Sequence, residues 1–445
     1  MFKSFKKFIF LLFLASIIAA VIIFFPYFEL KPPQISFSRD ISNLGLAPFN
    51  IIFTDKGKGL KKVEILLITE KGEIQIAQKS YEKGVKKDEI TVKLNFNKIG
   101  FKNGHGELIV KAEDYSKSKV FSGNKTEVNA KVSLDLVPPT AAEISSTQYL
   151  NHGGSGFIVY KVSNDTVKSG VKIKDYFFKG YGRYFQNPDI RICFFAYPYD
   201  LGSDENIFLF AEDAAGNSAA QRVDYNLKNI VYRKSDIEVS ENFIQSKMLP
   251  ILINEGVSDS NLEVVFLKVN NELRKENNSK ISELGKNTAD KILWNGRFSQ
   301  LSNSKVEASF ADERTYLFND KPLDNQYHLG FDLSVTKNYP VEAANRGIVV
   351  FAGDLGIYGN TVILDHGMGV MSLYAHLSSI SVQENQELNK NDILGKTGVT
   401  GLAGGDHLHF AMYIQGVPVR PIEWWDQKWI NEKILDRIEA AKSAS

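Results

Sequence analysis

The sequence has only one cysteine, Cys193, among its 445 residues. A single thiol excludes an intramolecular disulfide, and it excludes a metal site built from several cysteines. Its neighbours Ile192, Phe194 and Phe195 are apolar, which predicts a small buried residue in a core. An excess of charge of one sign is also absent, because 53 Lys and Arg stand against 52 Asp and Glu. We therefore expect no nucleic-acid partner, since such partners require a basic surface.

The composition is that of a globular protein, not of a disordered chain. Hydrophobic residues make up 43% of the sequence and charged residues 24%. The length exceeds what one ordinary core accommodates, and it predicts about two to four domains. We expect a multidomain, mainly β protein with the parts described below.

One long apolar run stands at the N-terminus. Residues 8–25 carry no charge over 18 positions, which as a helix is about 27 Å and just spans a bilayer core. Lys3, Lys6 and Lys7 precede the run, so the short N-terminal tail is expected to stay in the cytoplasm. A cleaved signal peptide is the alternative, but the apolar run continues past the small residues at which cleavage would occur. We predict that residues 1–30 form a cytoplasmic tail and a single transmembrane anchor.

The next 200 or so residues favour β structure, since apolar and polar residues alternate and turn residues recur at short intervals. Two short motifs, Pro-Pro and Ala-Glu-Asp, recur about 100 residues apart, at 32–33 and 138–139 and at 112–114 and 211–213. A repeat of this length with many short strands predicts two tandem immunoglobulin-like (Ig-like) β-sandwich domains, residues 31–137 and 138–235. They could act as a spacer, bind glycan or dock a protein partner.

Residues 236–293 are predicted to form a helical connector. A short helix is expected at 241–252. Apolar residues at helical spacing predict a second helix over 262–273, with Asp259 or Ser260 as its N-cap. Such an apolar stripe is typical of a helix that packs on a neighbouring domain.

Histidines are few but clustered. Five of the seven lie between residues 327 and 410: His328, His366, His376, His407 and His409. Imidazoles plus one carboxylate, here Asp332, are the ligands of a catalytic zinc ion, with a fourth position left to water. In a strand, the two histidines of 407–409 emerge on the same face. His328 and Asp332 would be roughly 13 Å apart on an extended strand, so the chain must turn between them, and Gly330 can supply that turn.

Three motifs carry a family resemblance: Tyr-His-Leu-Gly-Phe-Asp at 327–332, Tyr-Ala-His-Leu-Ser at 374–378 and Gly-Asp-His-Leu-His-Phe at 405–410. Together they resemble the lysostaphin/LytM-type zinc metallopeptidases, peptidase family M23. The resemblance covers about residues 294–427. It implies an antiparallel-β peptidase domain, with a C-terminal helix, over residues 294–445.

The resemblance also implies the roles of individual residues. His328, Asp332 and His409 match the family's three zinc ligands, which predicts one Zn2+ per chain. His376 and His407 match the two non-ligand histidines that act on water and on the developing oxyanion. The sequence leaves open which of these two histidines does which.

By the same resemblance, we expect a zinc endopeptidase that hydrolyses peptide cross-links of bacterial peptidoglycan. The N-terminal run predicts that it is membrane-anchored, with its catalytic domain in the periplasm, outside the inner (cytoplasmic) membrane. Two alternatives stay open: a non-catalytic regulator of a cell-wall amidase, and a zinc carboxypeptidase that removes a terminal D-alanine. His366, in the Asp-His-Gly motif at 365–367, is predicted to have a structural role near the groove. The sequence does not identify the cross-link that is cut.

Overall fold

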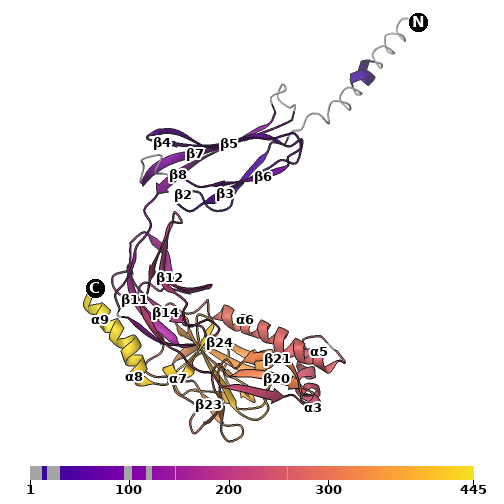
Figure 1. Cartoon of the computed structure of the whole chain (residues 1–445), viewed down its shortest axis with the longest axis vertical. Coiled ribbons are helices and arrows are strands. Elements are labelled where there is room, and N and C mark those ends of the chain that lie inside the picture. Colours follow the sequence, from indigo (N-terminus) through magenta and orange to yellow (C-terminus); the bar gives the residue numbers. More distant parts are fainter. Residues whose placement is uncertain are drawn as a thin grey trace. The chain divides into compact units, whose positions relative to one another are not determined.

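The computed structural model describes residues 13–17, 31–94, 103–116, 123–145, 147–257 and 259–444 (Figure 1). Its secondary structure is mainly β, as predicted. Apart from residues 13–17, the predicted anchor lies outside the described residues. Among the residues that are described, no helix is long and apolar enough to cross a bilayer.

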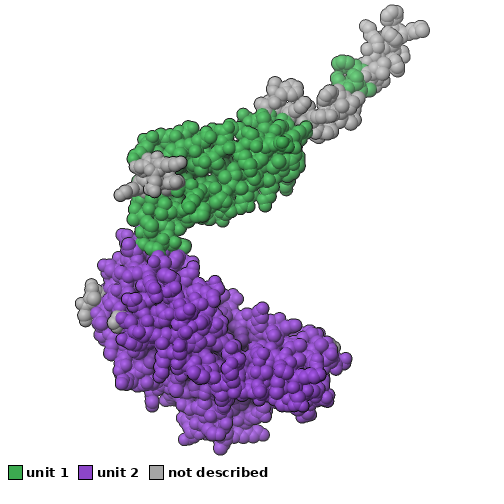
Figure 2. All heavy atoms as spheres, viewed as in Figure 1, with its two compact units in different colours: residues 1–139, 212–219 green, residues 140–211, 220–445 purple. Residues whose placement is uncertain are grey.

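The contacts divide the chain into two compact units, residues 1–139 with 212–219 and residues 140–211 with 220–445 (Figure 2). The described residues of unit 1 form two sheets, in the orders β1-β3-β6 and β2-β8-β7-β4-β5. Their strands are β1 (Gln34–Phe37), β2 (Asn43–Leu44), β3 (Phe49–Thr54), β4 (Leu60–Thr69), β5 (Gly72–Ser80), β6 (Lys87–Val92), β7 (Asn103–Asp114) and β8 (Lys125–Asp135). Alternate residues such as Phe53, Leu67 and Val110 are buried in one core, so the two sheets share a hydrophobic interior.

A second group of short strands lies mostly in unit 2, except for residues 212–213 of β15 and 218–219 of β16. The strands are β9 (Ala141–Glu143), β10 (Gln148–Asn151), β11 (Ser155–Val162), β12 (Thr166–Ile173), β13 (Tyr176–Lys179), β14 (Ile190–Ala196), β15 (Ile207–Asp213), β16 (Ser218–Arg222) and β17 (Tyr225–Lys228). They form sheets in the orders β14-β11-β9, β13-β12-β15-β16 and β10-β17. Cys193 on β14 is fully buried, as predicted. The Ig-like assignment of the two β regions stays a prediction.

These strands share a core with the C-terminal part of unit 2. The ring of Phe194 lies 6.4 Å from that of Trp294 and 6.2 Å from that of Trp424. Beside them, the buried Glu423 carboxylate accepts hydrogen bonds from the Asn151 amide and from the backbone N–H of Ser155, both at 2.7 Å. The β region and the C-terminal region are therefore fixed to each other by apolar packing and by a satisfied buried carboxylate.

The connector is helical, as predicted, except for one strand at its start. Its elements are β18 (Lys234–Glu238), α3 (Glu241–Phe243), η3 (Ile244–Met248), α4 (Leu249–Asn254), α5 (Leu262–Leu267), η4 (Lys268–Leu273) and α6 (Arg274–Leu284). The predicted cap was wrong: Asn261 caps α5, because its side chain accepts the backbone N–H groups of Glu263 and Val264. Strand β18 pairs in parallel with β20 (Glu313–Phe318), which pairs with β21 (Lys321–Tyr327). The connector thus enters a sheet that leads into the histidine cluster.

The C-terminal region is built on one antiparallel sheet in the order β19-β22-β30-β26-β25-β24-β28, with β31 beside β30. The strands are β19 (Lys305–Ala308), β22 (Phe331–Ser334), β24 (Gly347–Asp354), β25 (Asn360–Gly367), β26 (Val370–Ala375), β28 (Glu387–Leu388), β30 (Leu408–Ile414) and β31 (Val417–Val419). A small separate sheet consists of β23 (Pro340–Glu342), β29 (Ile393–Lys396) and β27 (Ser379–Ile380). The short helical turn η5 (Gly356–Tyr358) connects β24 to β25.

Both faces of the main sheet are covered. Ile363 and Leu373 pack with Phe266 of the connector, whereas Leu364 and Tyr374 belong to the core that also holds Trp424. The C-terminal helices α7 (Pro421–Trp424), α8 (Gln427–Ile430), η6 (Asn431–Leu435) and α9 (Asp436–Ala444) follow. Ile430, Ile434 and Ile438, spaced one turn apart, are buried. The predicted C-terminal helix packed on the domain is present.

Candidate metal centre

Strand register brings two of the predicted ligands together. Asp332 on β22 and His409 on β30 are direct partners in the antiparallel pair, so their side chains lie on the same face. His328 stands in the turn before β22. Its backbone N–H donates to the Asp312 carbonyl at 3.0 Å, and its carbonyl accepts from Ala311 at 2.6 Å. The long-range pair and the local turn therefore converge on one point.

Gly330 lies at the predicted bend between His328 and Asp332, and a second constraint also requires a glycine there. Its φ is not among the positive values, so it does not supply a left-handed turn. A Cβ at this position would lie 2.6 Å from the Phe410 carbonyl oxygen and 2.7 Å from Nε2 of His409. The glycine therefore lets the chain pass close to β30 and to a ligand ring.

Three donor atoms form a nearly equilateral triangle. Nε2 of His328 lies 2.9 Å from Oδ1 of Asp332 and 3.0 Å from Nδ1 of His409, and the third side is 3.0 Å. A tetrahedral zinc ion with bonds of about 2.0–2.1 Å separates its ligand atoms by about 3.3 Å. Among the described residues, this set is one of the groups whose geometry could hold a metal ion.

The surroundings of the triangle also suit a cation. Nδ1 of His328 lies 2.9 Å from the Ser309 carbonyl, so Nδ1 carries the proton and Nε2 presents its lone pair. Nε2 of His409 is buried and has no hydrogen-bond partner among the described residues. Two buried imidazoles and one partly buried carboxylate that face each other at 3 Å have the donor chemistry of a zinc site.

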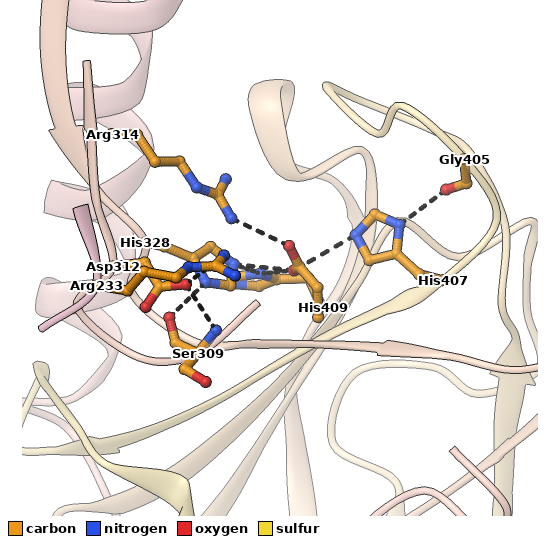
Figure 3. Close-up of polar contacts among 9 residues, drawn as sticks. Arg233, Ser309, Asp312, Arg314, His328, Gly405, His407 and His409 are labelled. Carbon is orange, nitrogen blue, oxygen red and sulfur yellow. Dashed lines mark hydrogen bonds and ion pairs between the residues drawn. The ribbon is translucent and has the colours of Figure 1, made fainter. Parts of the chain in front are cut away.

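Arg314 contacts the other oxygen of the carboxylate. Its Nη2 lies 3.3 Å from Oδ2 of Asp332, and Figure 3 shows the guanidinium directed at this group. Burial acts to raise the pKa of Asp332, but its interactions with the neighbouring imidazoles of His328, His407 and His409 outweigh it. The pKa is held well below the usual range. The group is therefore a carboxylate at neutral pH.

His376 and His407 lie beside the triangle, with their ring centroids 4.9 Å apart. Each ring is oriented by a backbone carbonyl at 2.8 Å. Nδ1 of His376 faces the Thr400 carbonyl, and Nδ1 of His407 faces the Gly405 carbonyl (Figure 3). His376 follows β26 with a φ of +62°, an uncommon conformation for a residue with a side chain. Nε2 of His407 lies 3.4 Å from Oδ1 of Asp332.

The two rings have opposite electrostatic surroundings. Burial, helped by the charges of His407 and His409, lowers the pKa of His376 well below its ordinary value. Burial also acts to lower the pKa of His407, but its hydrogen bond and charge interaction with Asp332 dominate and raise it. Such a difference is typical of a pair in which one imidazole is neutral and the other protonated.

All five predicted residues line one cavity of about 450 Å³. Arg314, Tyr358 and Arg274 border the same cavity but were not among the predicted site residues. Segments far apart in the chain bring these three residues together, so local spacing does not predict that they meet. The connector contributes to the lining from Ile237 to Arg274, so it forms part of the cavity wall.

His366 lies apart from this cavity. It is fully buried, with Nδ1 2.7 Å from the Arg346 carbonyl and Nε2 2.7 Å from the Ser372 hydroxyl. Its ring packs edge-on against Phe298, with a centroid distance of 4.8 Å. Both ring nitrogens are satisfied within the sheet, which agrees with the predicted structural role.

An antiparallel sheet that presents two imidazoles and a carboxylate at one point, with two further imidazoles beside them, defines a metallopeptidase-type centre. Residues 326–421 match Peptidase family M23. The chain therefore carries an M23 domain in its C-terminal part, and members of this family are zinc metallopeptidases that act on peptidoglycan. The family resemblance seen in the sequence is confirmed.

The curated relatives match only part of this chain. The chain is 40% identical over 95 residues, 21% of its length, to the DD-carboxypeptidase/endopeptidase Mpg of Neisseria meningitidis. It is 33% identical over 100 residues, 22% of its length, to the murein hydrolase activator NlpD of Salmonella dublin. The matches span only 22% and 26% of those relatives. The solved catalytic domain of lysostaphin from Staphylococcus simulans aligns with 29% of this chain and 98% of its own, at 24% identity and a TM-score of 0.26.

Proposed function

We propose that this protein is a zinc-dependent endopeptidase that hydrolyses peptide cross-links of bacterial peptidoglycan. The observation that carries the proposal is the triangle of Nε2 of His328, Oδ1 of Asp332 and Nδ1 of His409, with sides of 2.9–3.0 Å, in a cavity that two further histidines share. Three protein ligands with a fourth position for water are the pattern of catalytic zinc sites.

His328, Asp332 and His409 would hold the ion. When bound, zinc supplies a Lewis acid that polarises the scissile carbonyl and makes water more acidic. The second nitrogen of the His328 ring is fixed by the Ser309 carbonyl, and the second oxygen of Asp332 is fixed by Arg314. These contacts orient the ligands before any substrate arrives.

His376 and His407 would move protons. With Nδ1 bonded to a carbonyl, each ring presents Nε2 as the atom that accepts or donates a proton. The neutral ring of His376 suits the acceptance of a proton from the attacking water. The raised pKa of His407 suits stabilisation of the developing oxyanion and donation of a proton to the leaving amine.

A digestion assay tests the proposal. The purified full-length protein is incubated with peptidoglycan, with and without a chelator, and the soluble products are identified by mass spectrometry. An endopeptidase converts cross-linked muropeptide dimers to monomers, and zinc restores the activity that the chelator removes. Loss of only one terminal residue would indicate a carboxypeptidase, which the name of the Mpg relative also includes.

The second candidate function is that of a regulator that activates a cell-wall amidase, because one relative is a murein hydrolase activator. The five filled positions at the centre favour the enzyme. Absence of any product from the protein alone, together with stimulation of a purified amidase, would establish the regulator instead.

The proposal includes a location. The charge-free run at 8–25, preceded by three lysines, would anchor the chain in the cytoplasmic membrane with the catalytic domain on the outer side. The β regions would then hold that domain away from the bilayer or dock a protein partner. Protease treatment of intact spheroplasts tests this orientation: digestion of the catalytic domain is expected, and full protection would contradict it.

A further inference from the structure

The connector is a fixed wall of the active cavity. Oδ1 of Asn277 on α6 accepts the backbone N–H of Ile357 at 3.0 Å, and Oδ1 of Asn278 accepts the hydroxyl of Tyr358 at 2.8 Å. Gly356 has a φ of +52°, and a Cβ there would lie 2.6 Å from Asn277. Phe266 is also buried in the core that the connector shares with the sheet. Packing and hydrogen bonds therefore hold α5 to α6 in place beside the metal centre.

Arg274, the first residue of α6, stands where two cavities meet. It lines the cavity of about 450 Å³ that holds the three ligands, and also a neighbouring cavity of about 620 Å³. Leu329, next to the ligand His328, borders both cavities too. The second cavity is bordered by Tyr176 and Tyr199 of the β region. A substrate that extends from the metal centre into the second cavity would therefore pass Arg274.

The guanidinium is positioned by η4, which directly precedes α6. Nε and Nη2 of Arg274 donate to the backbone and side-chain oxygens of Asn270, at 2.9 and 2.6 Å. Asn270 is buried, and its Nδ2 donates to Oδ2 of Asp324 at 2.8 Å. These contacts use two N–H groups of a guanidinium that has five. The side chain is thus oriented in advance, with donors left over.

The guanidinium of Arg274 forms no ion pair with a described residue. Within the part of the chain that the structure describes, no carboxylate forms an ion pair with Arg274, whereas Arg314 of the same cavity pairs with Asp332. Arginine stays protonated, and its planar donors match a carboxylate in two-point contact. A half-buried cation of this kind, beside a peptidase centre, is suited to an anionic group of the substrate.

We propose that Arg274 is a specificity residue that binds a free carboxylate of the peptide substrate close to the scissile bond. This inference rests on the proposed function, and it narrows the substrate class. A cross-link made through diaminopimelate carries a free carboxylate beside the scissile peptide bond, whereas a bridge of glycines does not. The protein therefore acts on the carboxylate-bearing class of cross-link.

Binding, measured apart from cleavage, tests the proposal. The probe is a D-alanyl-diaminopimelate cross-link peptide whose scissile amide is replaced by a methyleneamine, prepared with the neighbouring carboxylate either free or amidated. Calorimetry on the zinc-loaded full-length protein should show that the probe with the free carboxylate binds at least about tenfold more tightly than the amidated probe. This is the contribution of a hydrogen bond to a charged group. In Arg274→Gln this preference should fall towards one, and Arg274→Lys should recover part of it.

Two controls separate a specific role of Arg274 from a general effect of charge and from a loss of folding. Arg222→Gln makes the same charge change on exposed β16, away from both cavities, and should keep the wild-type preference. Equal melting temperatures would show that Arg274→Gln remains folded. A wild-type protein without preference, or an Arg274→Gln variant that retains it, overturns the proposal. Cleavage of the unmodified peptide is scored separately, so selective binding without hydrolysis would overturn the proposed endopeptidase and leave the role of Arg274 standing.

Discussion

His409 and His366 are both buried imidazoles on the same antiparallel sheet, yet they differ in what surrounds their nitrogens. Burial lowers the pKa of each to about 4. His366 has both nitrogens hydrogen-bonded, to the Arg346 carbonyl and the Ser372 hydroxyl. His409 has one nitrogen in the ligand triangle and the other without a partner among the described residues. A shifted pKa therefore does not distinguish a metal ligand from a structural histidine, whereas the convergence of donor atoms does.

The largest expected effect comes from exchanging these two histidines for alanine in turn. His409→Ala removes one corner of the triangle, so zinc affinity should fall by more than about a hundredfold and hydrolysis should be lost. His366→Ala should keep one zinc per chain but lose about 2–4 kcal/mol of folding free energy, because it leaves a cavity and an unpaired buried hydroxyl. Elemental analysis and urea unfolding measure the two quantities. Retention of zinc by His409→Ala would contradict the ligand assignment.

The next comparison is between His409 and its neighbour His407, which stand two residues apart on one face. The group whose donor atoms could hold a metal ion is His328, Asp332 and His409, without His407. Nε2 of His407 nevertheless lies 3.4 Å from Oδ1 of Asp332. His407→Ala should therefore keep zinc while the turnover number falls by about 10²–10⁴-fold, the usual contribution of an acid or base. Turnover of defined muropeptide dimers and metal content are measured on the same sample. Loss of zinc from this variant would make His407 a ligand.

Local spacing predicted which residues within each motif lie close together, whereas the pairing of β22 with β30 brings the motifs to one point. The period of a strand relates His407 to His409, and a turn relates His328 to Asp332. The bend at Gly330 was predicted, but the close approach of β30 to this glycine was not, since it depends on long-range pairing that the local sequence does not contain.

Residues outside the motifs could not be predicted in the same way. Arg274 reaches the cavity because Asn277 and Asn278 hold α6 against the turn at 356–358, about 80 positions later in the chain. Strand β18 escaped prediction because its pairing partner β20 lies far along the sequence. The cap of α5 is a local feature, but Asp259, Ser260 and Asn261 are all good capping residues, and propensity alone does not choose between them.

The pH dependence of stability sharpens the account of His366. Its pKa is lowered from 6.5 to about 4 in the folded protein, so the unfolded chain binds a proton first as the pH falls. The contribution of the neutral, buried His366 to the free energy of unfolding is therefore fully present above pH 6.5. It is lost as the pH falls from about 6.5 to 4, and the total loss is about 3 kcal/mol. His366→Gln cannot titrate and should lack this loss, while His105→Gln, an exposed change, should behave as wild type. If the unfolding free energies of wild type and His366→Gln, measured in urea, change with pH in the same way over this range, the lowered pKa of His366 is refuted.

The smallest expected effect concerns two arginine–carboxylate pairs of similar length. Arg314 lies 3.3 Å from Asp332 with side chains about one-fifth exposed, whereas Arg346 lies 3.1 Å from Glu387 with side chains more than half exposed. Arg314→Gln should lower zinc affinity by about 10–100-fold, because it removes the charge that orients a ligand. Arg346→Gln should leave zinc affinity unchanged, since exposed pairs contribute about 0–1 kcal/mol and this one touches no ligand. Competition with a chromogenic chelator measures both. Equal affinities in the two variants would mean that the triangle is positioned by the strands alone, without help from the guanidinium.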